Sequence, residues 1–408
     1  MAERRVSERA ILLLVGAVQF VNILDFMILA PLGPRVAKEL GMLESQLPDA
    51  TAAYTFAGGV AGIVGSFFLD RFERRRALTI AALGLAAGTA AGGLATDLTT
   101  LVLARMLAGL FGGPATSLAI AVISDVIPPE RRGRAMGAIM GAFAAASVLG
   151  VPMGILLAEH GGFRVPLFVV AGMGVVVAAA SWAFLPNLRD HLDGPAAHHP
   201  SGYLEMLRRP AVVTSYLMTA ALNGSFFALV PNISTYTLNN LRLPEPQLKW
   251  MYLAGGLVSL VTARVAGRFV DRVGAFRIGT FGTLLQMVVV YVSFATALLP
   301  IAGAFLASMY GMFTAFMFSN SVRAVALGTL TSRVPHPDER ARFQSLQSSV
   351  QHLSSAAGAS LSARLLSTSA SHELVGFPRV AYVALAGAAV LPFLMARVER
   401  LVARDAKP

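Results

Sequence analysis

The feature that most constrains this chain of 408 residues is a series of long apolar stretches separated by short polar ones. A helix needs about 20 apolar residues to cross the roughly 30 Å hydrocarbon core of a bilayer. Twelve stretches reach or approach that length, so the sequence predicts an all-α integral membrane protein with twelve transmembrane helices. Their ranges are Ala10–Leu32, Asp49–Leu69, Ala77–Ala95, Leu98–Val126, Gly133–Ala158, Val165–Leu185, Ala211–Leu238, Gln247–Ala266, Arg277–Leu298, Ile301–Leu330, Ala341–Leu366 and Arg379–Val398.

The composition also points to lipid as the solvent. Charged residues make up 13% of the chain and hydrophobic residues 55%, whereas soluble domains carry about 25% charged residues. So little charge cannot cover a water-exposed surface of this size. The chain contains no cysteine, which excludes a disulfide framework, a thiolate metal site and a cysteine nucleophile.

The net charge of +11 does not indicate a nucleic-acid-binding surface, because the basic residues are placed as in a membrane protein. With the N-terminus placed in the cytoplasm, most of the 33 Lys and Arg residues fall in the tails and in the loops on the cytoplasmic side. This asymmetry follows the positive-inside rule, and it predicts cytoplasmic termini and no nucleic-acid partner. The opposite side carries Arg35, Lys38, Arg164, Arg242 and Arg379.

The least hydrophobic internal segment divides the spans into two sets of six. It contains His198-His199-Pro200, and we interpret it as a solvated linker rather than a metal site, because no further ligand stands at a suitable spacing. The predicted domains are an N-terminal six-helix bundle at residues 1–186, a cytoplasmic linker at 187–210 and a C-terminal six-helix bundle at 211–408. Repeats of this kind are a common transporter layout.

Short charged loops recur at matching places in the two halves. After the second span comes Asp70-Arg71-Phe72-Glu73-Arg74-Arg75, and after the eighth comes Asp271-Arg272-Val273-Gly274. After the fourth span stands Pro129-Glu130-Arg131-Arg132, and after the tenth stands Pro337-Asp338-Glu339-Arg340. The repetition predicts that the two bundles are pseudo-symmetric.

These loops resemble the Gly-x-x-x-Asp-Arg-x-Gly-Arg-Arg pattern of the major facilitator superfamily. The second copy keeps Gly267, Asp271, Arg272 and Gly274, whereas the first has Ser66 and Glu73 at the glycine positions. The resemblance implies alternating access, with this loop acting as a gate latch and an acid at the end of the fourth helix as its partner. Asp125 occupies that place. The residues to which the resemblance assigns a gating role here are Asp70, Arg71, Asp125, Asp271 and Arg272; the alternative is charge that only sets the membrane topology.

Two further stretches resemble the twelve-helix drug:proton antiporter branch of that family, the multidrug or arabinose-efflux type. Arg105-Met106-Leu107-Ala108-Gly109 on the fourth span is similar to its membrane-embedded arginine motif. Gly150-Val151-Pro152-Met153-Gly154 on the fifth is similar to its Gly-Pro-Gly signature. The resemblance implies a gating pivot at Gly150, Pro152 and Gly154, for which simple helix packing is the alternative.

Asp25 is the most informative single residue, because it stands inside an otherwise apolar span. A carboxylate there costs about 2.5–3.5 kcal/mol on insertion scales, so it persists when it is paired, hydrated or protonated. Arg105 lies at a comparable depth and is the expected partner. We predict a proton-coupling site formed by Asp25 and Arg105; the alternatives are a structural hydrogen bond and a permanent ion pair that only fixes helix packing.

Polar and aromatic residues at mid-span predict the substrate cavity, although each can instead pack between helices. A cavity of this composition suits amphipathic or cationic organic molecules. For His352 we expect a structural hydrogen bond rather than a second proton-transfer role, and for Arg323 a snorkelling or loop-contacting side chain. The cavity candidates are Gln19, Asn22, Asn223, Phe226, Phe227, Phe313, Phe316, Asn320 and His352.

The leading hypothesis is a proton-coupled exporter that functions as a monomer. It would cross the inner membrane of a bacterial cell several times. It would use no cofactor or metal besides the coupling proton. An importer or facilitator of a small metabolite or lipid remains the alternative. Against an enzyme, the chain lacks hydrolase, metalloprotease and phosphate-binding motifs; against a receptor, it lacks a sizeable domain outside the membrane.

Overall fold

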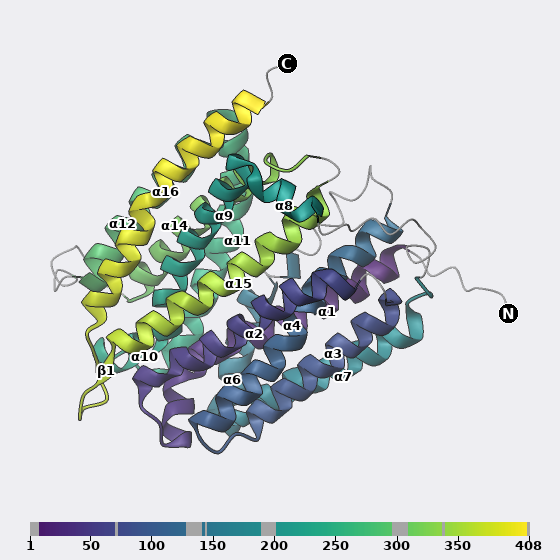
Figure 1. Cartoon of the computed structure of the whole chain (residues 1–408). Coiled ribbons are helices and arrows are strands. Elements are labelled where there is room, and N and C mark those ends of the chain that lie inside the picture. The colour runs from purple at the N-terminus through teal and green to yellow at the C-terminus, as the bar shows by residue number, and fades with distance from the viewer. Residues whose placement is uncertain are drawn as a thin grey trace. The chain divides into compact units, whose positions relative to one another are not determined.

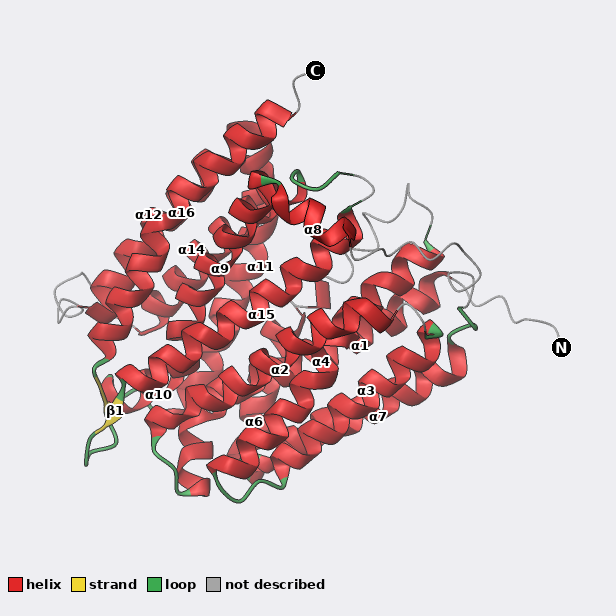
Figure 2. Cartoon of the chain, viewed as in Figure 1, coloured by secondary structure: helices red, strands yellow, loops and turns green. Residues whose placement is uncertain are grey.

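The computed structural model describes residues 8–69, 72–127, 141–142, 145–188, 201–295, 309–336 and 339–405. Helices make up nearly all of this part of the chain, and a two-stranded antiparallel hairpin is the exception (Figure 1, Figure 2). The hairpin joins β1 (Ser367–Thr368) to β2 (Leu374–Val375). The described residues are therefore all-α, as predicted.

The chain forms two compact units: Met1–Met42 with Ala53–His199, and Leu43–Ala52 with Pro200–Pro408. The first unit holds α1 (Glu8–Leu40), most of α2 (Leu47–Phe68), α3 (Arg74–Gly93), α4 (Leu98–Val126), a π-helical turn (Ala146–Gly150), α6 (Val151–Gly161) and α7 (Arg164–Phe184). Its apolar core lies between α1, α3 and α4, where Val15, Leu78 and Val122 are buried.

The second unit holds α8 (Ser201–Arg208), α9 (Pro210–Leu229), α10 (Ile233–Thr235), α11 (Leu248–Val273), α12 (Ala275–Val290), α14 (Met309–Ser332), α15 (Arg340–Leu365) and α16 (Phe377–Asp405). Helix α9 packs against both α15 and α16, and α14 packs against α11 and α12. Buried Met218, Leu330 and Met395 belong to its core.

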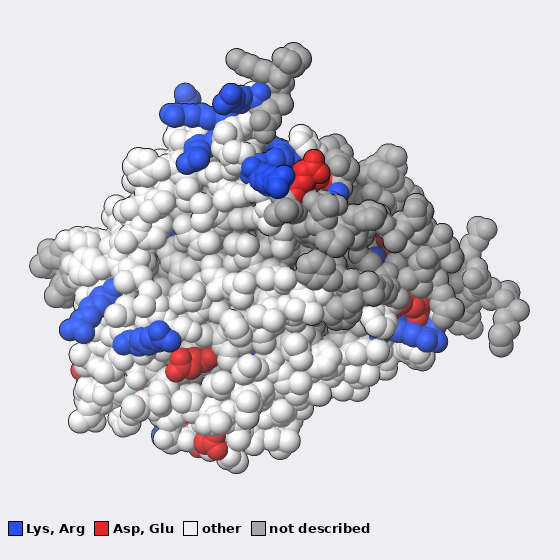
Figure 3. Space-filling view, in the orientation of Figure 1, with Lys and Arg blue, Asp and Glu red and all other residues white. Residues whose placement is uncertain are grey.

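Among the described residues, seven helices are long and apolar enough to cross a membrane: Glu8–Leu40, Leu98–Ile123, Arg164–Phe184, Pro210–Asn240, Glu245–Val273, Ala275–Ala295 and Phe377–Arg404. Large apolar side chains are exposed on several of them, including Leu13, Leu103 and Val261. Uncharged side chains make up most of the described surface visible in Figure 3. Such surfaces suit contact with lipid. The full set of twelve remains a prediction.

Several boundaries differ from the predicted ones. Helix α1 continues to Leu40 through Pro31 and Pro34, although proline removes an intrahelical hydrogen bond; packing of membrane helices tolerates this. The α-helical pattern is interrupted at Pro231, because α9 ends at Leu229 and a 3₁₀ turn, Val230–Asn232, follows. The start of the predicted fifth span and the start of the tenth lie outside the described residues.

Candidate functional site

Asp25 and Arg105 form an ion pair inside the first unit. Asp25 on α1 has 0% of its surface exposed and Arg105 on α4 has 2%. Arg105 Nη1 donates to Asp25 Oδ1 at 2.8 Å, and Nη2 donates to the backbone carbonyl of Asp25 at 3.2 Å. The predicted contact between the two side chains is therefore present, while its role in proton coupling stays a prediction.

Two neighbours that the sequence analysis did not identify complete this site. Thr89 on α3 donates its hydroxyl to Asp25 Oδ1 at 2.7 Å. The Tyr54 ring on α2 lies 4.4 Å from the guanidinium carbon of Arg105, which is a cation–π contact. Threonine and tyrosine occur at many places in the spans, so only the fold reveals which of them face Asp25.

The two oxygens of Asp25 have different surroundings. Oδ1 accepts hydrogen bonds from Arg105 and Thr89, whereas Oδ2 is buried with no hydrogen-bond partner among the described residues. A buried carboxylate oxygen without a hydrogen bond is unfavourable. The two oxygens of this carboxyl group are therefore held in unequal environments.

Asn22 forms contacts between helices rather than presenting its amide to a cavity. Its Nδ2 donates to the carbonyl of Gly112 at 3.0 Å and to Thr116 Oγ1 at 2.9 Å. Its Oδ1 accepts from the Tyr54 hydroxyl at 2.9 Å. These bonds link α1, α2 and α4 next to the ion pair. Gln19, one turn earlier, is buried and its Oε1 lacks a hydrogen-bond partner in the described part of the chain.

Glycines on α4 bring its backbone against α2. A Cβ at Gly109 would overlap the backbone carbonyl of Tyr54, and one at Gly113 would overlap the carbonyl of Gly58. A Cβ at Gly112 would lie 2.5 Å from the Tyr54 hydroxyl oxygen. Only glycine permits this approach, which places Tyr54 under Arg105.

The Gly-Pro-Gly segment packs closely against α1. Gly150 closes a π-helical turn, Ala146–Gly150, and Pro152 stands in the first turn of α6. A Cβ at Gly150 would meet Leu24, and one at Gly154 would overlap Ile28. The contacts show helix packing beside Asp25; a pivot at this point remains a prediction.

Among the predicted gating residues, Asp125 has a defined partner. Arg74 Nε at the start of α3 lies 3.1 Å from Asp125 Oδ2 at the end of α4. Asp70 and Arg71 lie outside the described residues. Asp271 and Arg272 end α11 before Gly274, whose φ is +101°, and both are exposed, with no ion pair in the described chain.

The predicted aromatic cavity residues of the second unit contact one another. Phe226 stacks on Phe316 with ring centres 5.7 Å apart, and it meets Phe227 edge-on at 5.3 Å. Phe313 packs against Tyr252 at 4.9 Å. Phe313 and Phe316 are buried. In this structure these two rings belong to helix packing, which was the alternative considered for each.

Two polar candidates of the second unit form hydrogen bonds within their own helices. Asn223 donates to the carbonyl of Thr219 one turn earlier at 2.9 Å, and Asn320 Oδ1 accepts from Arg323. The structural hydrogen bond expected for His352 is absent among the described residues. That expectation was wrong for the described residues, among which the ring is half-buried.

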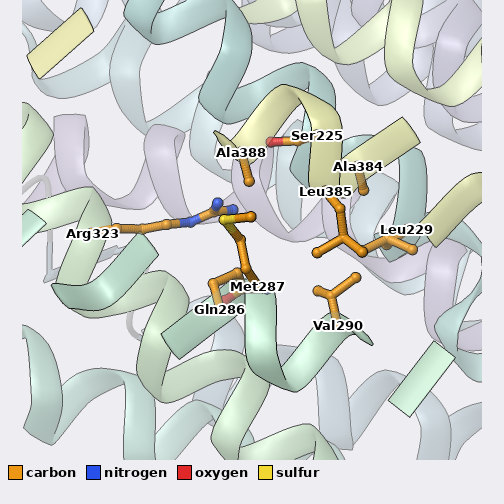
Figure 4. A pocket seen from close by; sticks show the side chains of 9 residues that line it. All are labelled: Ser225, Leu229, Gln286, Met287, Val290, Arg323, Ala384, Leu385 and Ala388. Atoms are coloured by element: carbon orange, nitrogen blue, oxygen red, sulfur yellow. The ribbon is translucent and has the colours of Figure 1, made fainter. Parts of the chain in front are cut away.

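Arg323 does not snorkel, so that expectation was also wrong. Its side chain is 1% exposed and points into a small pocket between α9, α12, α14 and α16 (Figure 4). Arg323 stands too far along α14 to match Arg105 in the first half, and the sequence pattern offered no partner for it. Only the packing of four helices shows where it lies.

Comparisons with known proteins agree with this architecture. Residues 15–359 match the family model described as Major Facilitator Superfamily. A chloramphenicol resistance protein of Streptomyces lividans is 25% identical over 273 residues, 67% of this chain and 69% of that protein. YceJ of Bacillus subtilis (strain 168), an uncharacterized MFS-type transporter, is 23% identical over 370 residues, 90% and 92% of the two chains.

Among solved structures, a D-xylose–proton symporter superposes with a TM-score of 0.75 at 16% identity, covering 94% of this chain and 97% of that one. At this identity the likeness shows the fold alone. The family and these neighbours are transporters, not enzymes, as expected, and they carry small molecules across membranes in which they have several spans. The chain is helical, an ion pair is buried between its apolar helices, and the family match covers most of its length. This chain therefore belongs to the major facilitator superfamily.

Proposed function

We propose that this transporter is a proton-coupled exporter of a small amphipathic or cationic organic molecule, working by alternating access. It has twelve transmembrane helices in two pseudo-symmetric bundles, with both termini in the cytoplasm. It acts as a monomer in the inner membrane of a bacterial cell, with a proton as its coupling ion and no cofactor. The bilayer and the substrate are its partners.

The observation that carries the proposal is the buried Asp25–Arg105 pair. In the unprotonated form the two charges neutralise each other at 2.8 Å. A proton arriving on Oδ2, the oxygen without a partner, removes the negative charge and leaves Arg105 without its counter-ion. The protonated and unprotonated forms therefore prefer different helix arrangements, which is the differential affinity that a coupled transport cycle requires.

The full burial of Asp25 limits when the proton can exchange. With 0% of the residue exposed, the carboxyl group is closed to water in this state. Proton loading and release then belong to other states of the cycle, in which the helices around α1 and α4 separate. The Arg74–Asp125 pair at the ends of α3 and α4 is suited to a latch that opens between such states.

The substrate class rests on the aromatic side chains of α9 and on the relatives. Phe226 and Phe227 are partly exposed, and aromatic rings bind apolar bodies and organic cations. A relative from Streptomyces lividans is named for chloramphenicol resistance. Export of a small aromatic compound is therefore the transport reaction to test first.

Everted membrane vesicles provide the test, with chloramphenicol and ethidium as a neutral and a cationic probe. We expect uptake into energised vesicles to release protons from the lumen in the wild type and not in Asp25→Asn. Asp97→Asn is the matched control, because that side chain lies outside the membrane and caps α4. Undiminished proton release in Asp25→Asn contradicts the coupling role, and accumulation of a probe by intact cells contradicts export.

A further inference from the structure

Arg323 lies at a small pocket within the second unit, separate from the residues used above. The pocket measures about 10 Å³, which is space for about one water-sized particle. Figure 4 shows the guanidinium group reaching in beside Met287, with Gln286 nearby. The lining residues are Ser225, Leu229, Gln286, Met287, Val290, Arg323, Ala384, Leu385 and Ala388.

The hydrogen bonds of Arg323 leave one of its nitrogens unused. Nε and Nη2 both donate to Asn320 Oδ1 at 3.2 Å, whereas Nη1 is buried with no hydrogen-bond partner among the described residues. No carboxylate in the described chain pairs with this guanidinium. In contrast, the equally buried Arg105 has Asp25 as its counter-ion.

A guanidinium group stays protonated in proteins, so its positive charge persists in the helix interior. Burying a charge without a partner is strongly unfavourable, and such residues inside membrane helices are paired or functional. A neutral amide such as Asn320 satisfies two N–H groups but supplies no opposite charge. The missing component is therefore an anion beside Nη1.

The lining of the pocket determines which anion fits. It contains no acidic residue, so nothing in it repels negative charge. Ser319 donates to Gln286 Oε1 at 2.6 Å, which assigns the acceptor end of that amide to Ser319 and leaves its Nε2 as a second donor. The Ser225 hydroxyl donates to the Ala221 carbonyl at 2.6 Å. The remaining walls are aliphatic or thioether groups, and a pocket of about 10 Å³ favours a small ion over an organic carboxylate.

We propose that the Arg323 pocket binds one small monovalent inorganic anion, of which chloride is the representative. The anion accepts hydrogen bonds from Arg323 Nη1 and Gln286 Nε2 and neutralises the charge inside the second unit. It is a bound structural component rather than the transported molecule, because the pocket offers only about 10 Å³, space for about one water-sized particle. The proposal is independent of proton coupling at Asp25.

The test measures thermal unfolding of the purified full chain in detergent, at constant ionic strength, while sodium chloride replaces sodium gluconate. We expect Tm to rise with the logarithm of chloride concentration above Kd, with bromide acting similarly and gluconate and sulfate having no effect. Arg323→Met should lose the response. Arg264→Met, which changes an exposed arginine on α11, is the matched control and should keep it.

A second variant keeps the proposal testable if Arg323→Met does not fold. Gln286→Glu places a carboxylate of the same size in the pocket as an internal counter-ion, so its Tm should be high in gluconate and insensitive to chloride. Crystals soaked in bromide should show anomalous density beside Arg323. A wild-type Tm without anion-specific dependence, or an unchanged response in both variants, overturns the site.

Discussion

Arg105 bonds only one carboxylate oxygen of Asp25: Oδ1 accepts its Nη1 at 2.8 Å, and Oδ2 has no hydrogen-bond partner in the described structure. This asymmetry separates the two tasks that the carboxyl group would perform. One oxygen keeps α1 attached to α4 and, through Thr89, to α3. The other is the atom at which a proton can be added without displacing either bond.

The stability of the buried pair should be strongly non-additive. Arg105→Gln leaves an uncompensated acid and should destabilise the protein by about 3–5 kcal/mol, whereas replacing both partners is much less harmful. We therefore expect the double variant Asp25→Asn with Arg105→Gln to be more stable than the sum of the single changes indicates. Equilibrium unfolding in detergent measures this. Additive effects would show that the two side chains act independently.

The ion pair between Arg74 and Asp125 should affect transport more than folding. Asp125 is 30% exposed, so losing the pair in Asp125→Asn should lower stability by about 1 kcal/mol or less. If the Arg74–Asp125 pair holds the transporter closed, Asp125→Asn should change the initial rate of transport more strongly than it changes stability. Asp125→Glu keeps the charge and should retain most of the rate. Equal rates in the wild type and both variants would contradict a latch.

The backbone contact between α2 and α4 makes Gly109→Ala a damaging change. Its Cβ would overlap the Tyr54 carbonyl, and such overpacking costs about 1–3 kcal/mol. Gly172→Ala on α7 is the control, because no atom lies within 4 Å of an added Cβ there. We expect a lower Tm for Gly109→Ala and an unchanged or slightly higher Tm for Gly172→Ala. Equal Tm values for both variants would refute the contact.

The cap of α4 should make stability depend on pH in the acid range. Asp97 accepts from the backbone N–H of Thr100 at 2.9 Å. This bond is the main cause that lowers the pKa of Asp97 from its ordinary 3.8, and hydrogen bonds from the Thr100 and Thr96 side chains add to it. Because the pKa of Asp97 is lower in the folded state, its ionised side chain stabilises the protein above pH 3.8. This contribution is lost as pH falls through the folded-state pKa.

Asp97→Asn tests this, because asparagine also caps helices but does not titrate. Between pH 5 and pH 3, Tm measured in detergent should fall more in the wild type than in the variant. Thr100→Val, which keeps the backbone N–H but removes the hydroxyl, should show an intermediate loss. Parallel Tm curves for wild type and Asp97→Asn would refute the assignment.

Apolar patterning located the helices well, because a bilayer demands long uninterrupted stretches. It also singled out Asp25 and Arg105, since charges inside such stretches are rare. Helix ends were harder to place: α1 runs past Pro31 and Pro34 to Leu40 because packing by neighbouring helices, rather than local propensity, determines where it stops.

Side-chain surroundings could not be read from the chain. Asn22 and Phe316 sit at mid-span like true cavity residues, yet one bridges three helices and the other packs within an aromatic cluster. Arg323 looked like a snorkelling or loop-contacting residue because it does not stand at the repeat position of Arg105, and its burial depends on packing among α9, α12, α14 and α16. Thr89 gave no signal, since a single hydroxyl costs little in any membrane helix.

The glycine contacts of α4 have a mechanical consequence for the first unit. The main chains of neighbouring helices touch directly at Gly109 with Tyr54, at Gly113 with Gly58 and at Gly88 with Ala108. At these points no flexible side chain lies between the helices that could change its rotamer. Sliding of one helix along another would require tilting whole peptide planes. Helices α2, α3 and α4 therefore resist sliding along one another at these three points.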